Sequence, residues 1–129
     1  MGRPDNPYAA AAEFRSVLRQ FLRRSEDCAR RSGITPGQHL LLLQIAGATG
    51  GTTTVSDLVT TLALTQSAVT ELVQRAEAAG LVRRSSSNED GRVTDLSLTP
   101  KGAARLAEVH DALGAERAHL REAIDELDR

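Results

Sequence analysis

The chain has 129 residues, a formal net charge of −1 and a single Cys, and aromatic side chains make up only 2% of it. This length suits one domain, whose core Leu, Val and Ala must build. The sequence holds no run of about 18 apolar residues that could span a membrane. Its start, MGRPDNPY, lacks the apolar stretch of a signal peptide. Because one Cys cannot form an internal disulfide, we expect a cytoplasmic protein.

The first predicted element is a long amphipathic helix over about residues 7–32, which Ser32-Gly33 ends. Its apolar stripe recurs at helical spacing and consists of Phe14, Val17, Leu18, Phe21 and Leu22. Cys28 lies on the same line two turns further on. Seven Arg and four acidic residues fall within residues 1–37, a net charge of +3.

A second helix is predicted to begin after Thr35, which is placed to cap it, with Pro36 in the first helical position. The run from Leu40 to Ala46 is apolar on most sides of a helix. Such a helix must be covered from several directions, so we expect it to be central. A loop is predicted over residues 47–51, where glycines cluster.

Two short amphipathic helices follow, VSDLVTTL (Val55–Leu62) and QSAVTELVQRAEAAG (Gln66–Gly80). The connection Ala63-Leu64-Thr65 joins them, and Thr65 is placed to cap the second helix. Gly80 stands where a left-handed glycine would end that helix. Two helices of this length joined by three residues indicate a helix-turn-helix.

Two alternating runs come next, LVRRSSS (residues 81–87) and RVTDLSLT (residues 92–99), separated by the polar turn Asn88-Glu89-Asp90-Gly91. Asp-Gly between alternating runs is a strong hairpin signal. Helix-turn-helix and hairpin together predict a mainly α fold with a small β-wing. It is a winged helix-turn-helix lobe over about 36–99 within a single domain covering 1–129.

The last predicted helix runs over about 100–128, which is roughly 40 Å at ~1.5 Å per residue. Its apolar line follows the alternating spacing of a coiled-coil seam: Leu106, His110, Leu113, Arg117, Leu120, Ile124 and Leu127. A seam that projects from so small a domain predicts a partner helix from a second copy, so the first and last helices would be dimerisation helices. The alternative is a helix that folds back on its own domain, for which Gly114 permits a break.

The start of the second short helix presents polar side chains suited to base edges and phosphates in a major groove: Thr65, Gln66, Ser67, Thr70 and Glu71. Arg75, one turn further, suits a phosphate. Arg83, Arg84 and Arg92 gather along the wing, where an arginine can enter a narrow minor groove. Residues 52–102 nonetheless carry five basic and six acidic residues. Binding to double-stranded DNA would therefore depend on a few placed arginines and on doubling by a homodimer at an inverted repeat.

These residues resemble the multiple antibiotic resistance regulator (MarR) family of dimeric bacterial repressors. The resemblance runs through ITPGQHLLLLQIAG, LALTQSAVTELVQRAEAAGLVRR and EDGRVTDLSLTPKG. It implies that Arg92 enters the minor groove, that Asp90 orients it, and that Gln66, Ser67, Thr70 and Arg75 contact DNA. Two positions depart from the family pattern: Glu71 stands where a basic residue is common, and His39 where an aromatic is common.

The same resemblance implies a small lipophilic or aromatic effector, bound between the DNA-binding lobe and the dimerisation helices, that releases a repressor from its operator. By position, the residues that could line this pocket are Phe14, Leu18, Phe21, His39, Leu40, Leu43 and His110. The alternative interpretation is that these side chains are simply part of the core.

The sequence gives weaker support to other functions. Cys28 near Arg30 and Arg31 could be a redox-active thiol, although a Cys on an apolar stripe is usually a core residue. The three His and the Cys lack the spacing of a metal site, so no metal and no cofactor are predicted. No catalytic motif is present, which argues against an enzyme. A winged-helix module for protein–protein interaction stays an alternative, with Arg92 dispensable in that case.

Overall fold

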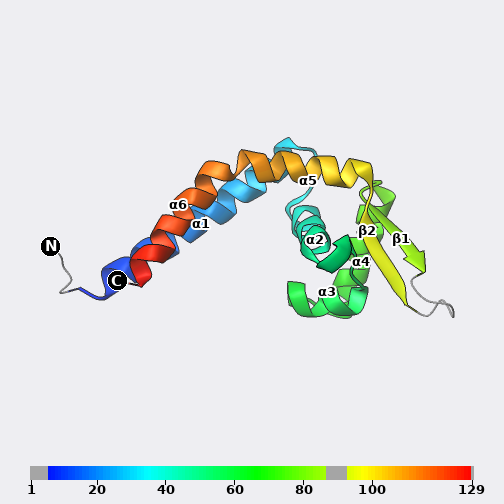
Figure 1. Ribbon diagram of the computed structural model, residues 1–129, viewed down its shortest axis with the longest axis horizontal. Coiled ribbons are helices and arrows are strands. Elements are labelled where there is room, and N and C mark those ends of the chain that lie inside the picture. Colours follow the sequence, from blue (N-terminus) through cyan, green and yellow to red (C-terminus); the bar gives the residue numbers. More distant parts are fainter. Residues whose placement is uncertain (1–5, 87–92, 129) are drawn as a thin grey trace.

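The computed structural model describes residues 6–86 and 93–128. Two parts are visible in Figure 1: a lobe made of the central helices and a hairpin, and an arm in which the first and last helices lie side by side. The elements in chain order are α1 (Tyr8–Arg31), α2 (Pro36–Gly47), a short 3₁₀ turn (Thr49–Gly51), α3 (Val55–Leu62), α4 (Gln66–Ala78), β1 (Val82–Ser86), β2 (Thr94–Leu98), α5 (Pro100–Ala112) and α6 (Gly114–Leu127). The predicted mainly α fold with a small β-wing is confirmed.

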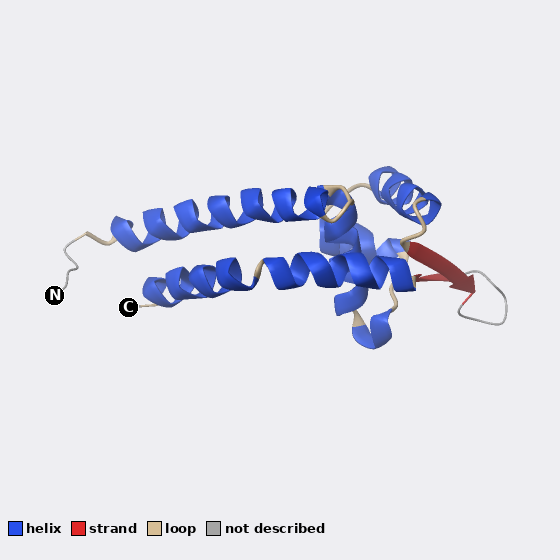
Figure 2. Ribbon diagram, turned by 90° about the horizontal axis from the view of Figure 1, so that it is seen from above, coloured by secondary structure: helices blue, strands red, loops and turns tan. Residues whose placement is uncertain are grey.

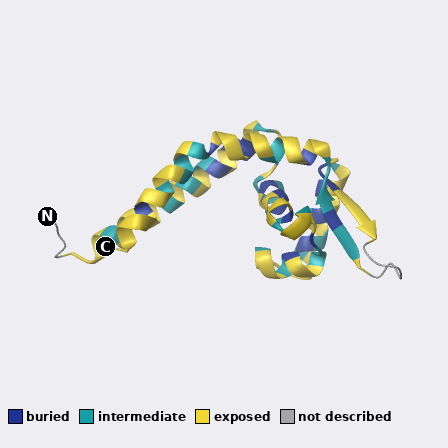
Figure 3. Cartoon of the chain, in the orientation of Figure 1, coloured by how far each residue is buried: buried dark blue, intermediate teal, exposed yellow. Residues whose placement is uncertain are grey.

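The centre of the lobe is α2, as its apolar run predicts. Thr35 accepts a hydrogen bond from the Gln38 N–H at 3.1 Å, and the Gln38 side chain accepts one from the Thr35 N–H at 3.0 Å. This reciprocal cap satisfies two backbone donors at the start of the helix. Leu41, Leu42 and Ile45 are fully buried beneath α3, α4, α5 and β2. In Figure 3 the buried residues accordingly gather in the lobe.

The helix-turn-helix follows the predicted boundaries closely. Thr54 caps α3 by accepting from the Asp57 N–H, and Thr65 caps α4 by accepting from the Ala68 N–H, both at 3.1 Å. Between them, Ala63 takes a left-handed conformation with φ of 56°, which turns the chain sharply enough for α4 to cross α3. Helix α4 ends at Ala78, and Gly80 follows the cap residue with a left-handed φ of 77°, as predicted.

The wing is a two-stranded antiparallel sheet with Val82 opposite Leu98 and Ser86 opposite Thr94. Leu81, Val93 and Thr99, which the prediction placed in the strands, lie outside them, and Ser87 and Arg92 lie outside the described residues. At the far end of β2, Thr99 leaves the sheet and caps α5 by accepting from the Gly102 N–H at 3.0 Å. The predicted turn over 88–91 lies outside the described residues. Thr53 pairs with Leu96 through two backbone hydrogen bonds and so ties the wing to the segment before α3.

The predicted single last helix is wrong at one point, because the chain bends at Leu113, where φ is −98° and ψ is 9°. Figure 2 shows the break between α5 and α6. The bend interrupts the backbone ladder, and the Arg117 side chain donates to the His110 carbonyl at 2.7 Å. Helix α6 packs along α1 of its own chain, while Ile124 and Leu127 stay 44% and 41% exposed. Within the described residues, no helix is both long enough and apolar enough to cross a membrane.

Gly102 is where α5 meets the root of the wing. A Cβ at this position would collide with the carbonyl oxygen of Leu81, so the backbone itself would have to shift. We expect Gly102→Ala to lower the free energy of unfolding by about 1–3 kcal/mol, since overpacking forces the backbone apart. Denaturant titration of the purified protein measures this change.

Gly114→Ala is the matched control, because a Cβ there meets only the flexible end of Arg117 at 3.9 Å. Gly114 opens α6, and Ala has the higher helix propensity, so this variant should be neutral or more stable by up to ~1 kcal/mol. Equal loss of stability in both variants would contradict the proposed close contact between α5 and Leu81.

Candidate nucleic-acid interface

Helix α4 has one buried and one exposed face. Val69, Val73 and Ala76 are fully buried against the lobe. The opposite face forms an open groove of about 450 Å³, lined by Gln66, Ser67, Thr70, Glu71 and Gln74. The structure thus brings together four of the residues predicted from the sequence to read bases. Gln74 was missed, although its position one turn after Thr70 on the same stripe is a readable signal.

Two other predicted residues of α4 are already engaged. The Thr65 hydroxyl accepts from the Ala68 N–H as the helix cap and so fixes the start of α4. Arg75 Nη2 lies 2.7 Å from Glu71 Oε2, one turn away on the same helix. Arg75 and Glu71 keep 73% and 62% of their side chains exposed. This pair places a carboxylate and a guanidinium together on the outward face of α4.

The wing carries a second pair of the same kind. Arg84 of β1 donates from Nε to Glu77 Oε1 of α4 at 2.8 Å. The pair joins the wing to the helix. Arg83, the next residue along the strand, points to the opposite side of the sheet, since successive side chains alternate. The predicted wing residues Arg92 and Asp90 lie outside the described residues.

Arg84 also borders a groove of about 580 Å³ between the wing and the start of α3, which Thr54, Ser56, Thr94 and the acidic Asp57 help to line. Unpaired backbone N–H groups at a helix start attract anions. An arginine beside such a start suits a phosphate. The sequence analysis did not assign Thr54 or Ser56, and the signal that could have found them is the cap position of Thr54.

The ion pairs of Arg75 and Arg84 are solvent-exposed, and such pairs contribute only about 0–1 kcal/mol. Exchanging a carboxylate for a phosphate therefore costs little. Both guanidinium groups are held in defined positions on the outer surface of the lobe. The arrangement can bind a polyanion with a few placed cations, without a basic surface.

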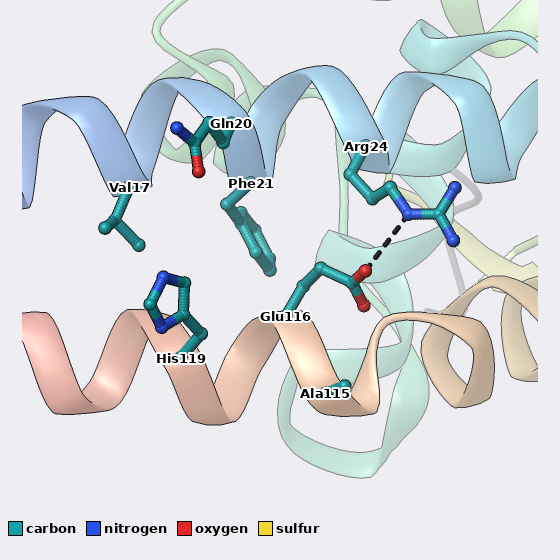
Figure 4. Close-up of a pocket in the computed structure, with 7 residues that line it drawn as sticks. All are labelled: Val17, Gln20, Phe21, Arg24, Ala115, Glu116 and His119. Carbon is teal, nitrogen blue, oxygen red and sulfur yellow. Dashed lines mark hydrogen bonds and ion pairs between the residues drawn. The ribbon is translucent and has the colours of Figure 1, made fainter.

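A cavity of about 330 Å³ lies in the arm between α1 and α6. Figure 4 shows Phe21 and Val17 of α1 facing Ala115 and His119 of α6. At one end, Arg24 Nε lies 3.0 Å from Glu116 Oε2. The hydrogen bond from Arg24 lowers the pKa of Glu116 below its usual range. The cavity therefore combines an apolar wall with a charged end.

The residues predicted to line an effector pocket do not share one cavity within this chain. Phe21 lines the arm cavity, whereas Leu43 and His110 line a separate groove of about 400 Å³ between α2 and α5. His39 is buried and Leu40 is 51% exposed. Phe14 and Leu18 are half-buried on α1. These predicted pocket residues are separated because the apolar stripe of α1 faces α6, whereas the outward leucines of α2 lie beside α5.

Cys28 is 4% exposed in the core cluster at the base of the arm. A thiol so covered has little access to an oxidant, which argues against the redox interpretation. Among residues 6–86 and 93–128, no three His, Cys, Asp or Glu side chains come close enough together to hold a metal ion.

The sequence of this chain is similar to those of known proteins. It is 32% identical over 98 residues to the HTH-type transcriptional repressor MdtR of Bacillus subtilis, an alignment covering 76% of this chain. The aligned region spans 59% of the length of that repressor. Residues 32–93, from the end of α1 through β1, match the sequence model of the MarR family. The chain belongs to the MarR family.

Solved structures share the fold of this chain. YusO from Bacillus subtilis superimposes with a TM-score of 0.63 at 26% identity, over 91% of this chain and 79% of YusO. A cysteine-to-serine mutant of MarR from Escherichia coli, complexed with operator DNA, gives a TM-score of 0.69 at 23% identity. That match covers 85% of this chain and 78% of the other, and it shows the shared winged-helix fold.

His39, which stands where MarR family members commonly have an aromatic residue, is 6% exposed at the junction of arm and lobe. Its Nδ1 lies 3.4 Å from the Ser25 hydroxyl of α1. Burial lowers the pKa of His39, and the neighbouring His110 lowers it further. The fold therefore disfavours the protonated form of the imidazole between α1 and α2.

A pKa that is lower in the folded state than in the unfolded state makes stability depend on pH. The unfolded chain takes up a proton near the ordinary pKa of about 6.5, and the folded chain resists it. The contribution of His39 is therefore fully present above that value and is lost as pH falls through it towards the folded pKa. We expect the free energy of unfolding to decline between about pH 7 and pH 5 and His39→Asn to flatten this decline. The same slope in wild type and His39→Asn would exclude His39 as the cause.

Proposed function

We propose that this MarR family chain is a sequence-specific, DNA-binding transcriptional regulator. It acts as a homodimeric repressor on an inverted repeat and is released by a small-molecule effector. The observation that carries the proposal is the exposed face of α4, where base-reading side chains line one groove opposite a fully buried face. Amide and hydroxyl groups with this spacing match the donors and acceptors of the major groove. The relatives named as a repressor and as an operator complex support the same role.

The dimer is supported by apolar surface that the single chain leaves uncovered. Large apolar side chains are exposed on the arm and beside it: Tyr8, Leu22, Leu40, Leu43, Ile124 and Leu127. Burying such side chains contributes about 1.5–3 kcal/mol each when the burial is complete. The arm of α1 and α6 projects from the lobe, so a second copy can reach it (Figure 2). Two lobes joined this way would address successive major grooves, about 34 Å apart.

The proposal of a small-molecule effector is supported by the cavities near the arm. The arm cavity and the groove between α2 and α5 both lie on elements that set the position of the lobe relative to the arm. A small lipophilic or aromatic compound bound there would favour one spacing of the two lobes. It would release DNA only through a difference in affinity between the two spacings.

A winged-helix module for protein contact is the second candidate. The observation in its favour is that Glu71 and Glu77 pair with Arg75 and Arg84, two of the cations on the described outer surface of the lobe. This candidate predicts a monomer or a hetero-oligomer that does not bind duplex DNA specifically.

A salt-dependent binding assay with sedimentation separates the two candidates. The probe is duplex DNA from upstream of the chain's own gene, with a shuffled duplex of the same composition as control. A regulator should bind as one dimer per duplex with nanomolar affinity, as is common for specific complexes, and the affinity should fall steeply with added salt. Equal binding to both duplexes at low salt, or a monomer in sedimentation, would reject the proposal for that DNA.

Arg84→Ala tests the phosphate role proposed for the wing. We expect weaker binding to specific and shuffled duplexes alike, and a salt slope reduced by about 1 for each protomer. Arg19→Ala is the charge-matched control, since Arg19 is exposed on α1 of the arm. An Arg84→Ala salt slope equal to that of Arg19→Ala would contradict the phosphate contact.

A further inference from the structure

Glu71 is an acidic side chain on the face of α4 that the proposed function directs into DNA. It lines the same groove as Gln66, Ser67 and Thr70, and 62% of its side chain is exposed. A carboxylate in this place is repelled by phosphates and can only accept hydrogen bonds. Arg75 donates to one of its oxygens, Oε2, and a contact of the other oxygen with DNA requires a donor on the DNA.

The floor of a major groove offers two kinds of donor, the exocyclic amines of cytosine and adenine. Guanine presents two acceptors there, and thymine an acceptor and a methyl group. Adenine carries its N7 acceptor directly beside the amine, which repels a carboxylate, whereas cytosine presents the N4 amine alone. The chemistry therefore favours cytosine as the base that Glu71 contacts.

Arg75 supports a contact between Glu71 and cytosine. Its Nη2 holds Glu71 through Oε2 at 2.7 Å, and the carboxylate has a second oxygen, Oε1, with which to accept from a base. The guanidinium cancels the charge of the carboxylate, so the pair approaches the DNA without adding net negative charge. Arginine is also the usual donor to the O6 and N7 of guanine, the base opposite cytosine.

Glu77 shows that an ion pair alone does not make a base-reading residue. It sits on the same helix and pairs with Arg84 at 2.8 Å, but it is absent from the residues that line the groove. Glu77 therefore has the same charge and a similar partner on the flank of α4. The two glutamates differ in position relative to the groove, and this makes Glu77 a matched control.

We infer that Glu71, held by Arg75, is a specificity-determining residue that selects a cytosine in each half of the inverted repeat. This inference rests on the proposed function and adds the base that the lobe reads. Removing the carboxylate should change sequence preference more than it changes affinity, because the Arg75 guanidinium, no longer neutralised by Glu71, then attracts the phosphates more strongly.

The test is selection from a pool of duplexes with a randomised centre, followed by affinity measurements on duplexes that differ at one base pair. Wild type should prefer cytosine at one position of each half-site, by about tenfold over the other bases. Glu71→Gln should move that preference towards adenine, since an amide matches its N6 and N7. Glu71→Ala should accept all four bases there nearly equally. Glu77→Gln should keep the cytosine preference.

The outcomes separate failure of this inference from failure of the proposed function. If wild type selects a sequence but Glu71→Gln and Glu71→Ala keep its preference at every position, Glu71 does not read a base. A uniform gain in affinity, equal to that of Glu77→Gln, would show that it acts only by repulsion. If wild type selects no sequence from the pool, the regulator proposal itself fails.

Discussion

The complete burial of α2 is the constraint on which the arrangement of the other elements depends. Leu41, Leu42 and Ile45 have no exposed surface, and a helix that is apolar on most sides is stable only when neighbours cover it. The base of α1, the helices α3 to α5 and the strand β2 are those neighbours. Because α3 and α4 must turn their apolar stripes towards α2, the polar side of α4 faces outward. Leu40 and Leu43 stay half-exposed on α2, which is where a second chain or a ligand has most to gain.

Local chemistry made much of this fold predictable. The caps at Thr35, Thr54 and Thr65 each follow from one hydroxyl at the start of an apolar period, and the bounds of α3 agree with the prediction. The bend at Leu113 was not the leading prediction, because the alternating spacing of apolar residues continues through Gly114 without interruption. What decides the bend is a contact across space: α6 packs on α1, and the Arg24–Glu116 pair helps to join them.

In the candidate site, too, some features could be predicted from the sequence and others depend on how the elements pack. The outward stripe of α4 could be predicted because residues three and four apart share one helical face, and the Glu71–Arg75 pair follows from the same spacing. The Glu77–Arg84 pair could not, since it joins a helix to a strand and depends on how the wing docks. The seven residues proposed for an effector pocket were chosen by position along three helices. Their separation into different cavities depends on the angle between arm and lobe, which no local pattern encodes.

The placement of charge decides what kind of binding the lobe can have. Basic and acidic residues nearly cancel over 52–102, so long-range attraction to a polyanion is weak. Arg84 must exchange the carboxylate of Glu77 for a phosphate, and the net gain of that exchange is small because both states are well solvated. Tight binding by such a lobe requires many aligned contacts made together, which a rigid pair of lobes supplies through effective concentration. For the proposed dimer, a small change in arm geometry would then remove most of the affinity, so control of DNA binding through the arm follows from the weakness of each lobe alone.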